Sequence, residues 1–303
     1  MSRRRTYNSF VIISLLYQIY EQVDRLPYKP PVTLFFLALN ITTFLFPIQL
    51  FGFRLWDVSQ NCLFPQKILS LISSQNYFGF LNRLILSSII HVDEQHLYYN
   101  MISFLIKGIQ LEQLLGSFSF LQLVLYSILA SHSIMVLLSA FLTQIPSFES
   151  HSGFYSCAVG FSAVIFSLKY VLYMRSSGNI HVMYFTVNIK YAAWAELVLI
   201  SLLNPNASFV GHLSGILAGM LYHHCLPHVP SWFAPARIPF DESRPRFSSI
   251  PSPNSNGERR GWEDFGSSTR RGASSRDGNF SPEPTLEPLT ADEIRRRRIR
   301  RYS

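Results

Sequence analysis

Charged side chains are scarce over most of the chain. Residues 1–229 contain only 12 Lys or Arg and 8 Asp or Glu, whereas residues 230–303 contain 14 Arg, 10 Asp or Glu and no Lys. The first region is too apolar for a water-soluble domain of its size, and the second is too polar to build a core. This division excludes a single soluble globular enzyme and predicts an all-α membrane protein with a disordered cytosolic tail.

Cysteine is scarce too. Cys62, Cys157 and Cys225 lie far apart in the sequence, and no two of them form a CxxC pair. This spacing excludes a multi-disulfide framework and a zinc site built on paired cysteines. His223 and His224 directly precede Cys225, but adjacent side chains on a helix point in different directions. We therefore expect no metal site and no cofactor.

Residues 1–229 contain several long apolar segments. The N-terminal one, residues 8–23, is too short to cross a bilayer, which needs about 20 apolar residues, so we expect an amphipathic helix at the membrane interface. The long connection over residues 54–94 is expected to fold onto the membrane. Six apolar segments are expected to cross it, namely residues 31–53, 95–115, 118–143, 154–174, 191–203 and 208–226.

The charge distribution predicts the orientation and the domain limits. Basic residues 3–5 precede the first span, Arg175 and Lys190 flank the loop between spans four and five, and the Arg-rich tail follows span six. Because cytoplasmic loops carry an excess of Lys and Arg, both termini are expected in the cytosol. The predicted regions are a basic and amphipathic segment (1–29), a six-helix domain (30–229), a disordered linker (230–287) and a basic C-terminal helix (288–303).

The C-terminal segment has the pattern of a short helix. Thr290 can cap it, with Glu293 three residues later as a capping box, and the arginines that follow suit the C-terminal end of the helix dipole. Arginines alone would bind anionic lipid, whereas the isoleucines beside them offer apolar contacts to a protein. We favour a protein partner, bound by Ile294, Arg295, Arg296, Arg297, Arg298 and Ile299.

Two polar groups inside the predicted spans could form a nucleophile and its base. A polar side chain in a bilayer costs free energy, so each one is a functional candidate. Ser162 follows Gly160 in the middle of span four, and His212 lies in span six. Gly211, Gly215 and Gly219 recur every four residues beside His212 and so line one helix face, which allows close helix packing. This packing would bring His212 Nε2 near Ser162 Oγ as a dyad. Taken singly, the serine would be a packing residue and the histidine a structural one.

Span two carries the candidate oxyanion donors. His96 and Asn100 are four residues apart and so lie on one helix face. Two neutral donors placed in this way could bind a developing oxyanion, or could simply form an interhelical hydrogen-bond pair. His91 lies at the membrane boundary, and Glu112, near the far end of the span, is interpreted as a capping or loop-bracing carboxylate.

Taken together, these residues resemble the rhomboid intramembrane serine proteases, and in particular a subgroup of the endoplasmic reticulum. The motifs of the resemblance, in the family's order over residues 30–226, are His96-x-x-x-Asn100, Glu112, Gly160-x-Ser162 and His212-x-x-Gly215-x-x-x-Gly219. Arg83 also matches the Arg of the family's first loop. Three positions depart from the family: Ala163 stands in place of Gly, Leu114 in place of Arg, and Asn82 in place of the Trp of the first loop.

The resemblance implies a six-helix rhomboid bundle and a role for each of these residues. Ser162 would be the nucleophile, and His212 the general base and then acid. His96, Asn100 and the Ser162 backbone N–H would form the oxyanion site, while Phe166 would pack against the His212 ring. The structural and supporting residues would be His91, Glu112, Gly160, Gly215 and Gly219. The subgroup also ends in a basic helix that binds the valosin-containing AAA ATPase, which implies the same partner here.

Two functions are consistent with the sequence. The first is an intramembrane serine protease that cleaves peptide bonds in or beside transmembrane segments, in the quality control of membrane proteins. The alternative is a non-catalytic adaptor that binds misfolded proteins in the lipid bilayer and passes them to the AAA ATPase through the arginine cluster. Neither involves nucleic acid. Replacing Ser162 separates the two, because only the protease needs its hydroxyl group.

Overall fold

The structure is a computed structural model and describes residues 9–26, 29–46, 49–50, 53–54, 57–182, 185–204 and 207–225. All of these belong to one unit of the chain, Met1–Ile250. The predictions for basic residues 3–5, for the linker over 230–287 and for the C-terminal helix with its cluster at 294–299 lie outside the described residues.

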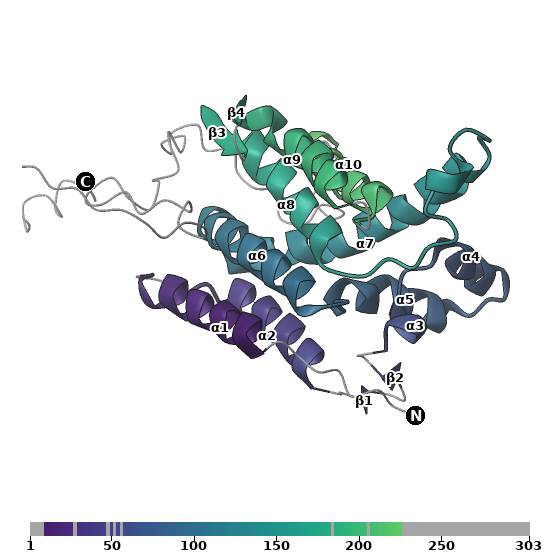
Figure 1. The fold of residues 1–303 in the computed structure, drawn as a ribbon, viewed down its shortest axis with the longest axis horizontal. Coiled ribbons are helices and arrows are strands. Elements are labelled where there is room, and N and C mark those ends of the chain that lie inside the picture. Colours follow the sequence, from purple (N-terminus) through teal and green to yellow (C-terminus); the bar gives the residue numbers. More distant parts are fainter. Residues whose placement is uncertain are drawn as a thin grey trace, which may run out of the picture. The chain divides into compact units, whose positions relative to one another are not determined.

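Helices make up most of the described chain (Figure 1). The first half contains α1 (Ser9–Asp24), α2 (Pro31–Leu45), α3 (Val58–Asn61), α4 (Pro65–Ser73), α5 (Tyr77–Ile89) and α6 (Glu94–Leu115). The second half contains α7 (Ser117–Thr143), α8 (Ser162–Met174), α9 (Ala192–Leu203) and α10 (Phe209–His224), with 3-10 turns at Glu149–His151 and Ile189–Tyr191. The predicted connection over 54–94 thus folds largely into three helices.

Two small antiparallel hairpins depart from the all-α prediction. The first pairs β1 (Gln49–Leu50) with β2 (Phe53–Arg54), and the second pairs β3 (Asn179–Val182) with β4 (Phe185–Asn188). Both lie in connections between helices, where two short strands can satisfy each other's backbone groups.

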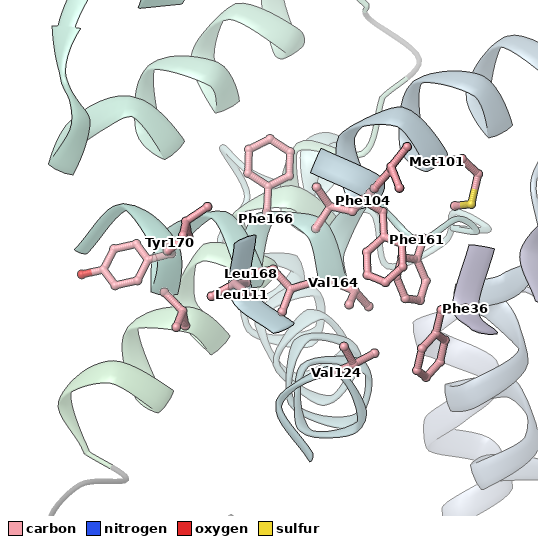
Figure 2. Close-up of a cluster of buried hydrophobic side chains, with 14 of the residues drawn as sticks. Phe36, Met101, Phe104, Leu111, Val124, Phe161, Val164, Phe166, Leu168 and Tyr170 are labelled. Atoms are coloured by element: carbon pink, nitrogen blue, oxygen red, sulfur yellow. The ribbon is translucent and has the colours of Figure 1, made fainter. Parts of the chain in front are cut away.

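α8 is the most deeply buried helix, and residues 163–173 on it are all buried. It packs most extensively against α10 and also contacts α6 and α7 (Figure 1). Phe161, directly before it, meets Phe104 of α6 edge to face with ring centroids 4.9 Å apart. Figure 2 shows this core, including Phe36, Met101, Phe104, Leu111, Val124, Phe161, Val164, Phe166, Leu168 and Tyr170.

The predicted first span is too long. α2 ends at Leu45, and Phe46 is extended with φ −113° and ψ 137°. The physical reason is Pro47, because the ring of a proline disfavours helical dihedrals in the residue before it. The helix begins at Pro31. Proline is tolerated there because the N–H that it lacks would have no partner within the helix at the first position.

The predicted start of span four is also wrong, and Ser162 is not in the middle of a helix. α8 begins at Ser162 itself. Gly160 has φ +111°, in a region that a right-handed helix cannot use, and its N–H donates to Ser87 O at 2.8 Å. Just before it, Ala158 pairs with Leu63 in an isolated antiparallel bridge. These backbone contacts hold the preceding residues out of the helix.

One helix among the described residues, α7, is long and apolar enough to cross a membrane, while α2 and α8 are apolar but shorter. The six-span arrangement therefore stays a prediction. α1 has two apolar faces: Ile12 and Leu15 are buried, whereas Phe10 and Tyr20 are exposed. The helix contacts α6, and its position at the membrane interface stays a prediction as well.

Candidate active site

The turn before α8 brings the backbone next to Ser162 against α6. A Cβ atom built on Gly160 would lie 2.6 Å from both Cε1 and Nε2 of His96 and 3.7 Å from Asn100 Nδ2. No side chain fits there, and the positive φ also favours glycine. The turn and the two candidate oxyanion donors are therefore in close contact.

α10 approaches α8 through its glycines. A Cβ atom on Gly215 would lie 2.2 Å from Ala163 O, and one on Gly219 would lie 2.7 Å from Ser167 O. Gly211 differs, because its Cβ would meet Ser208 of its own N-cap at 3.0 Å instead of α8. Two of the three glycines thus let the backbones of α8 and α10 touch, as small residues do at membrane helix interfaces.

This close packing joins the candidate nucleophile and base. His212 Nε2 lies 3.0 Å from Ser162 Oγ, within the hydrogen-bond reach that proton transfer requires. The His212 ring is buried and lies 4.8 Å from the Phe166 ring, centroid to centroid. His212 Nδ1 has no hydrogen-bond partner among the described residues, so no carboxylate orients the ring of the candidate base.

The candidate oxyanion donors sit on the first turns of α6. Asp93 caps this helix, and its Oδ1 accepts from the His96 N–H at 2.7 Å. Asn100 is buried, and its Nδ2 donates to His96 O at 2.9 Å; an amide nitrogen carries a second proton for another acceptor. In the loop before α6, the His91 ring lies edge to face with the His96 ring at 5.0 Å. Burial lowers the pKa of His91 well below its ordinary value, so the ring is neutral at physiological pH.

Glu112 lies away from the dyad, at the N-terminus of α2. Its Oε1 accepts from the Val32 N–H at 3.0 Å, and its Oε2 accepts from both the N–H and the Oγ1–H of Thr33 at 2.8 Å. The first N–H groups of a helix lack partners within the helix. The buried carboxylate of Glu112 accepts hydrogen bonds from these N–H groups. Glu112 thus caps α2 and fixes it to α6.

The sequence analysis did not predict a charged cluster that joins α8, α9 and α6. Lys169, seven residues after Ser162 on α8, pairs with Glu196 of α9, and Tyr173 donates to Glu196 Oε1 at 3.0 Å. Lys107 lies 5.3 Å from the centre of the Tyr173 ring. Glu196 had no role in our sequence interpretation. A signal was available in the sequence, because an acidic residue in one apolar span usually pairs with a basic residue in another.

Two further contacts were missed, and both fix the segments around the active site. Cys62 and Cys157 form a disulfide, which a single pair among three distant cysteines does not reveal. His132 of α7 is buried, and its Nδ1 bonds Leu84 O of α5 at 2.5 Å. No group of three His, Cys, Asp or Glu that could hold a metal occurs in the described part of the chain.

Comparison with known proteins gives the family. The family model of the rhomboid domain matches residues 79–228, which include both Ser162 and His212. The chain is 41% identical to rhomboid-like protein 14, mitochondrial, of Arabidopsis thaliana over 199 residues, or 65% of this chain and 57% of that protein. It is 38% identical to rhomboid-related protein 4 of Homo sapiens over 228 residues, or 73% of this chain and 65% of that protein. No solved structure matches it.

These matches span only 57% and 65% of the lengths of the two relatives. The matched rhomboid domain runs from α5 to beyond the end of α10, so it contains His96, Asn100, Ser162 and His212. The rhomboid family consists of membrane proteins that are generally intramembrane serine proteases, although some members are inactive. The domain match and the two relatives together establish that this chain belongs to the rhomboid family.

Proposed function

We propose that the chain is an intramembrane serine protease that cleaves peptide bonds in or beside transmembrane segments of other proteins. The observation that carries the proposal is the 3.0 Å separation of Ser162 Oγ and His212 Nε2. Ser162 Oγ attacks the carbonyl carbon of the substrate while His212 Nε2 takes its proton. The same nitrogen then returns the proton to the leaving amine, and a water molecule repeats the sequence on the acyl-enzyme.

The oxyanion of the tetrahedral intermediate forms next to the start of α8. The N–H groups of a first helical turn have no partners within the helix, and the positive end of the helix dipole favours an anion there. The Ser162 N–H, the second Asn100 Nδ2 proton and the His96 ring are the donors we assign to it. A nucleophile at the first residue of a helix gains this stabilisation, which the predicted mid-helix position would not supply.

The proposed location is the endoplasmic reticulum, with six spans and both termini in the cytosol. This orientation puts Cys62 and Cys157 on the same, non-cytosolic side, and disulfides persist in oxidising compartments. Arg175 and Lys190 then fall on the cytosolic side, in keeping with the excess of basic residues there. The proposed role is in membrane-protein quality control.

Cleavage in proteoliposomes tests the activity. The wild type and the variants Ser162→Ala and His212→Ala are offered a panel of transmembrane substrates with labile helices. We expect cleavage by the wild type alone, because each substitution removes one reacting group. Equal turnover by wild type and Ser162→Ala would overturn the proposal.

The alternative function is that of a non-catalytic adaptor. The observation in its favour is the run of arginines flanked by Ile294 and Ile299, which resembles a helix that binds the valosin-containing AAA ATPase. Under this alternative, loss of clients from the membrane survives Ser162→Ala but not replacement of residues 295–298. Under our proposal, Ser162→Ala abolishes it.

A further inference from the structure

A disulfide joins the first long connection to the segment that leads into the active site. Cys62, directly after α3, is bonded to Cys157, five residues before Ser162, with their Cα atoms 5.5 Å apart. The two cysteines are 95 residues apart in the chain. Cys62 is buried, whereas Cys157 is exposed and can be reached by a reductant.

Backbone hydrogen bonds extend this attachment on both sides of the disulfide. The Leu63 N–H donates to Ala158 O and the Ala158 N–H donates to Leu63 O, both at 2.9 Å. Cys62 O in turn accepts from Nη1 of the buried Arg83 on α5 at 3.0 Å. The stretch 157–158 is therefore fixed to a part of the chain that α5 holds in place.

Only three residues separate Ala158 from Ser162. Among them, Gly160 donates its N–H to Ser87 O of α5 at 2.8 Å and lies against the His96 ring. The chain has little slack over so short a distance, since consecutive Cα atoms are about 3.8 Å apart. A shift at Cys157 would thus move Gly160 relative to His96 and would change the angle at which the Ser162 N–H points.

We infer that the Cys62–Cys157 disulfide is a positioning element for catalysis, which holds the turn at Gly160 against His96 and so aligns the oxyanion donors. The inference rests on the proposed protease function. The active site is aligned in the oxidised protein and loses alignment when the bond is reduced. A dithiol such as dithiothreitol supplies the two electrons and two protons: the S–S bond breaks, two thiols form, and the reductant closes into its cyclic disulfide.

The effect falls on kcat more than on KM. The groups that move bind the oxyanion, which exists only in the transition state and the intermediate, so their misplacement removes stabilisation that the bound substrate does not share. Displacements of about 1 Å cost up to about 100-fold in rate. We expect reduction to lower kcat at least about tenfold, with KM changed much less.

The experiment compares four proteins in proteoliposomes, each before and after treatment with dithiothreitol: the wild type, Cys62→Ser, the double variant Cys62→Ser/Cys157→Ser, and Cys225→Ser. Cys225 is the exposed cysteine outside the disulfide and serves as the matched control. The wild type and Cys225→Ser should lose kcat on reduction. The two disulfide variants should start at the reduced value and show no further response.

Hydrogen exchange supplies a readout that does not depend on activity. On reduction, peptides over residues 157–166 should exchange faster, whereas peptides from α7 should not change. Unchanged exchange at 157–166 would overturn the inference, because the disulfide would then have no effect on the turn. An equal rise in exchange throughout the protein would also overturn it, because the disulfide would then stabilise the whole protein and not the turn in particular. If the oxidised wild type cleaves nothing, the protease proposal fails, and the exchange data still decide whether the disulfide positions the turn.

Discussion

α8 is joined to α10 and to α9 by different kinds of contact. Toward α10 the contact is steric, because Gly215 and Gly219 let the two backbones touch. Toward α9 it is electrostatic, through the pair Lys169–Glu196. α10 buries much of its length, whereas α9 buries only Ala192, Ala193 and Leu197. Steric contact thus sets the distance between Ser162 and His212, and a charged contact attaches the more loosely packed α9.

Among changes at the contacts of α8 with α9 and α10, the largest effect on cleavage is expected from Gly215→Ala. The added methyl would lie 2.2 Å from Ala163 O, and a backbone atom cannot move aside as a flexible side chain can. α10 must shift, which lengthens the distance from His212 to Ser162, and kcat/KM should fall about 100-fold. Gly211→Ala is the matched control, because its methyl meets the Ser208 side chain instead of α8. Equal losses in both variants would remove the distinction between the two glycines.

A smaller effect on cleavage, but a clear loss of stability, is expected from Glu196→Gln. This change leaves the Lys169 ammonium without its counter-charge in a buried site, and removal of one partner from a buried pair costs about 3 kcal/mol of unfolding free energy. Unfolding of the purified protein by sodium dodecyl sulfate measures the loss. The double variant Lys169→Met/Glu196→Gln should recover most of it. A double variant less stable than the single one would show that the charge is not the cause.

The smallest effect is expected from Tyr173→Phe. It removes the hydroxyl that donates to Glu196 Oε1 at 3.0 Å but leaves the ion pair in place. The unfolding free energy should fall by about 1 kcal/mol, with cleavage unchanged. In a Glu196→Gln background the same substitution should cost less, since the acceptor is then neutral. A loss as large as that of Glu196→Gln would place the hydroxyl, and not the charge, at the centre of the α8–α9 contact.

The sequence predicted the limits of some helices and not of others. The apolar run over residues 118–143 predicted α7 to within a residue, since a long continuous helix needs only composition and length. The start of α8 was not predicted, because apolar residues lie on both sides of Gly160, and the helix begins only after the backbone contacts to Ser87 and Leu63.

The residues of the candidate site and its surroundings also differ in how far the sequence predicts them. Ser162, His212, His96 and Asn100 were selected as candidates because they are polar residues in apolar spans, a signal that is local in sequence. The partners of Glu196 and of Cys62 depend on which helices and loops meet in space, and a single sequence does not record that. The carboxylate of Glu112 could be interpreted as a cap, but its target, the start of α2, is about 80 residues earlier.

Covalent capture of the nucleophile tests the central claim most directly. A fluorophosphonate reacts with a serine hydroxyl that a neighbouring base activates, and peptide mass spectrometry locates the adduct. Ser162 paired with His212 should give one adduct in the wild type, on the peptide that contains Ser162, and none in His212→Ala. An unlabelled Ser162 in a preparation that still cleaves substrate, or labelling that persists in His212→Ala, would contradict the dyad.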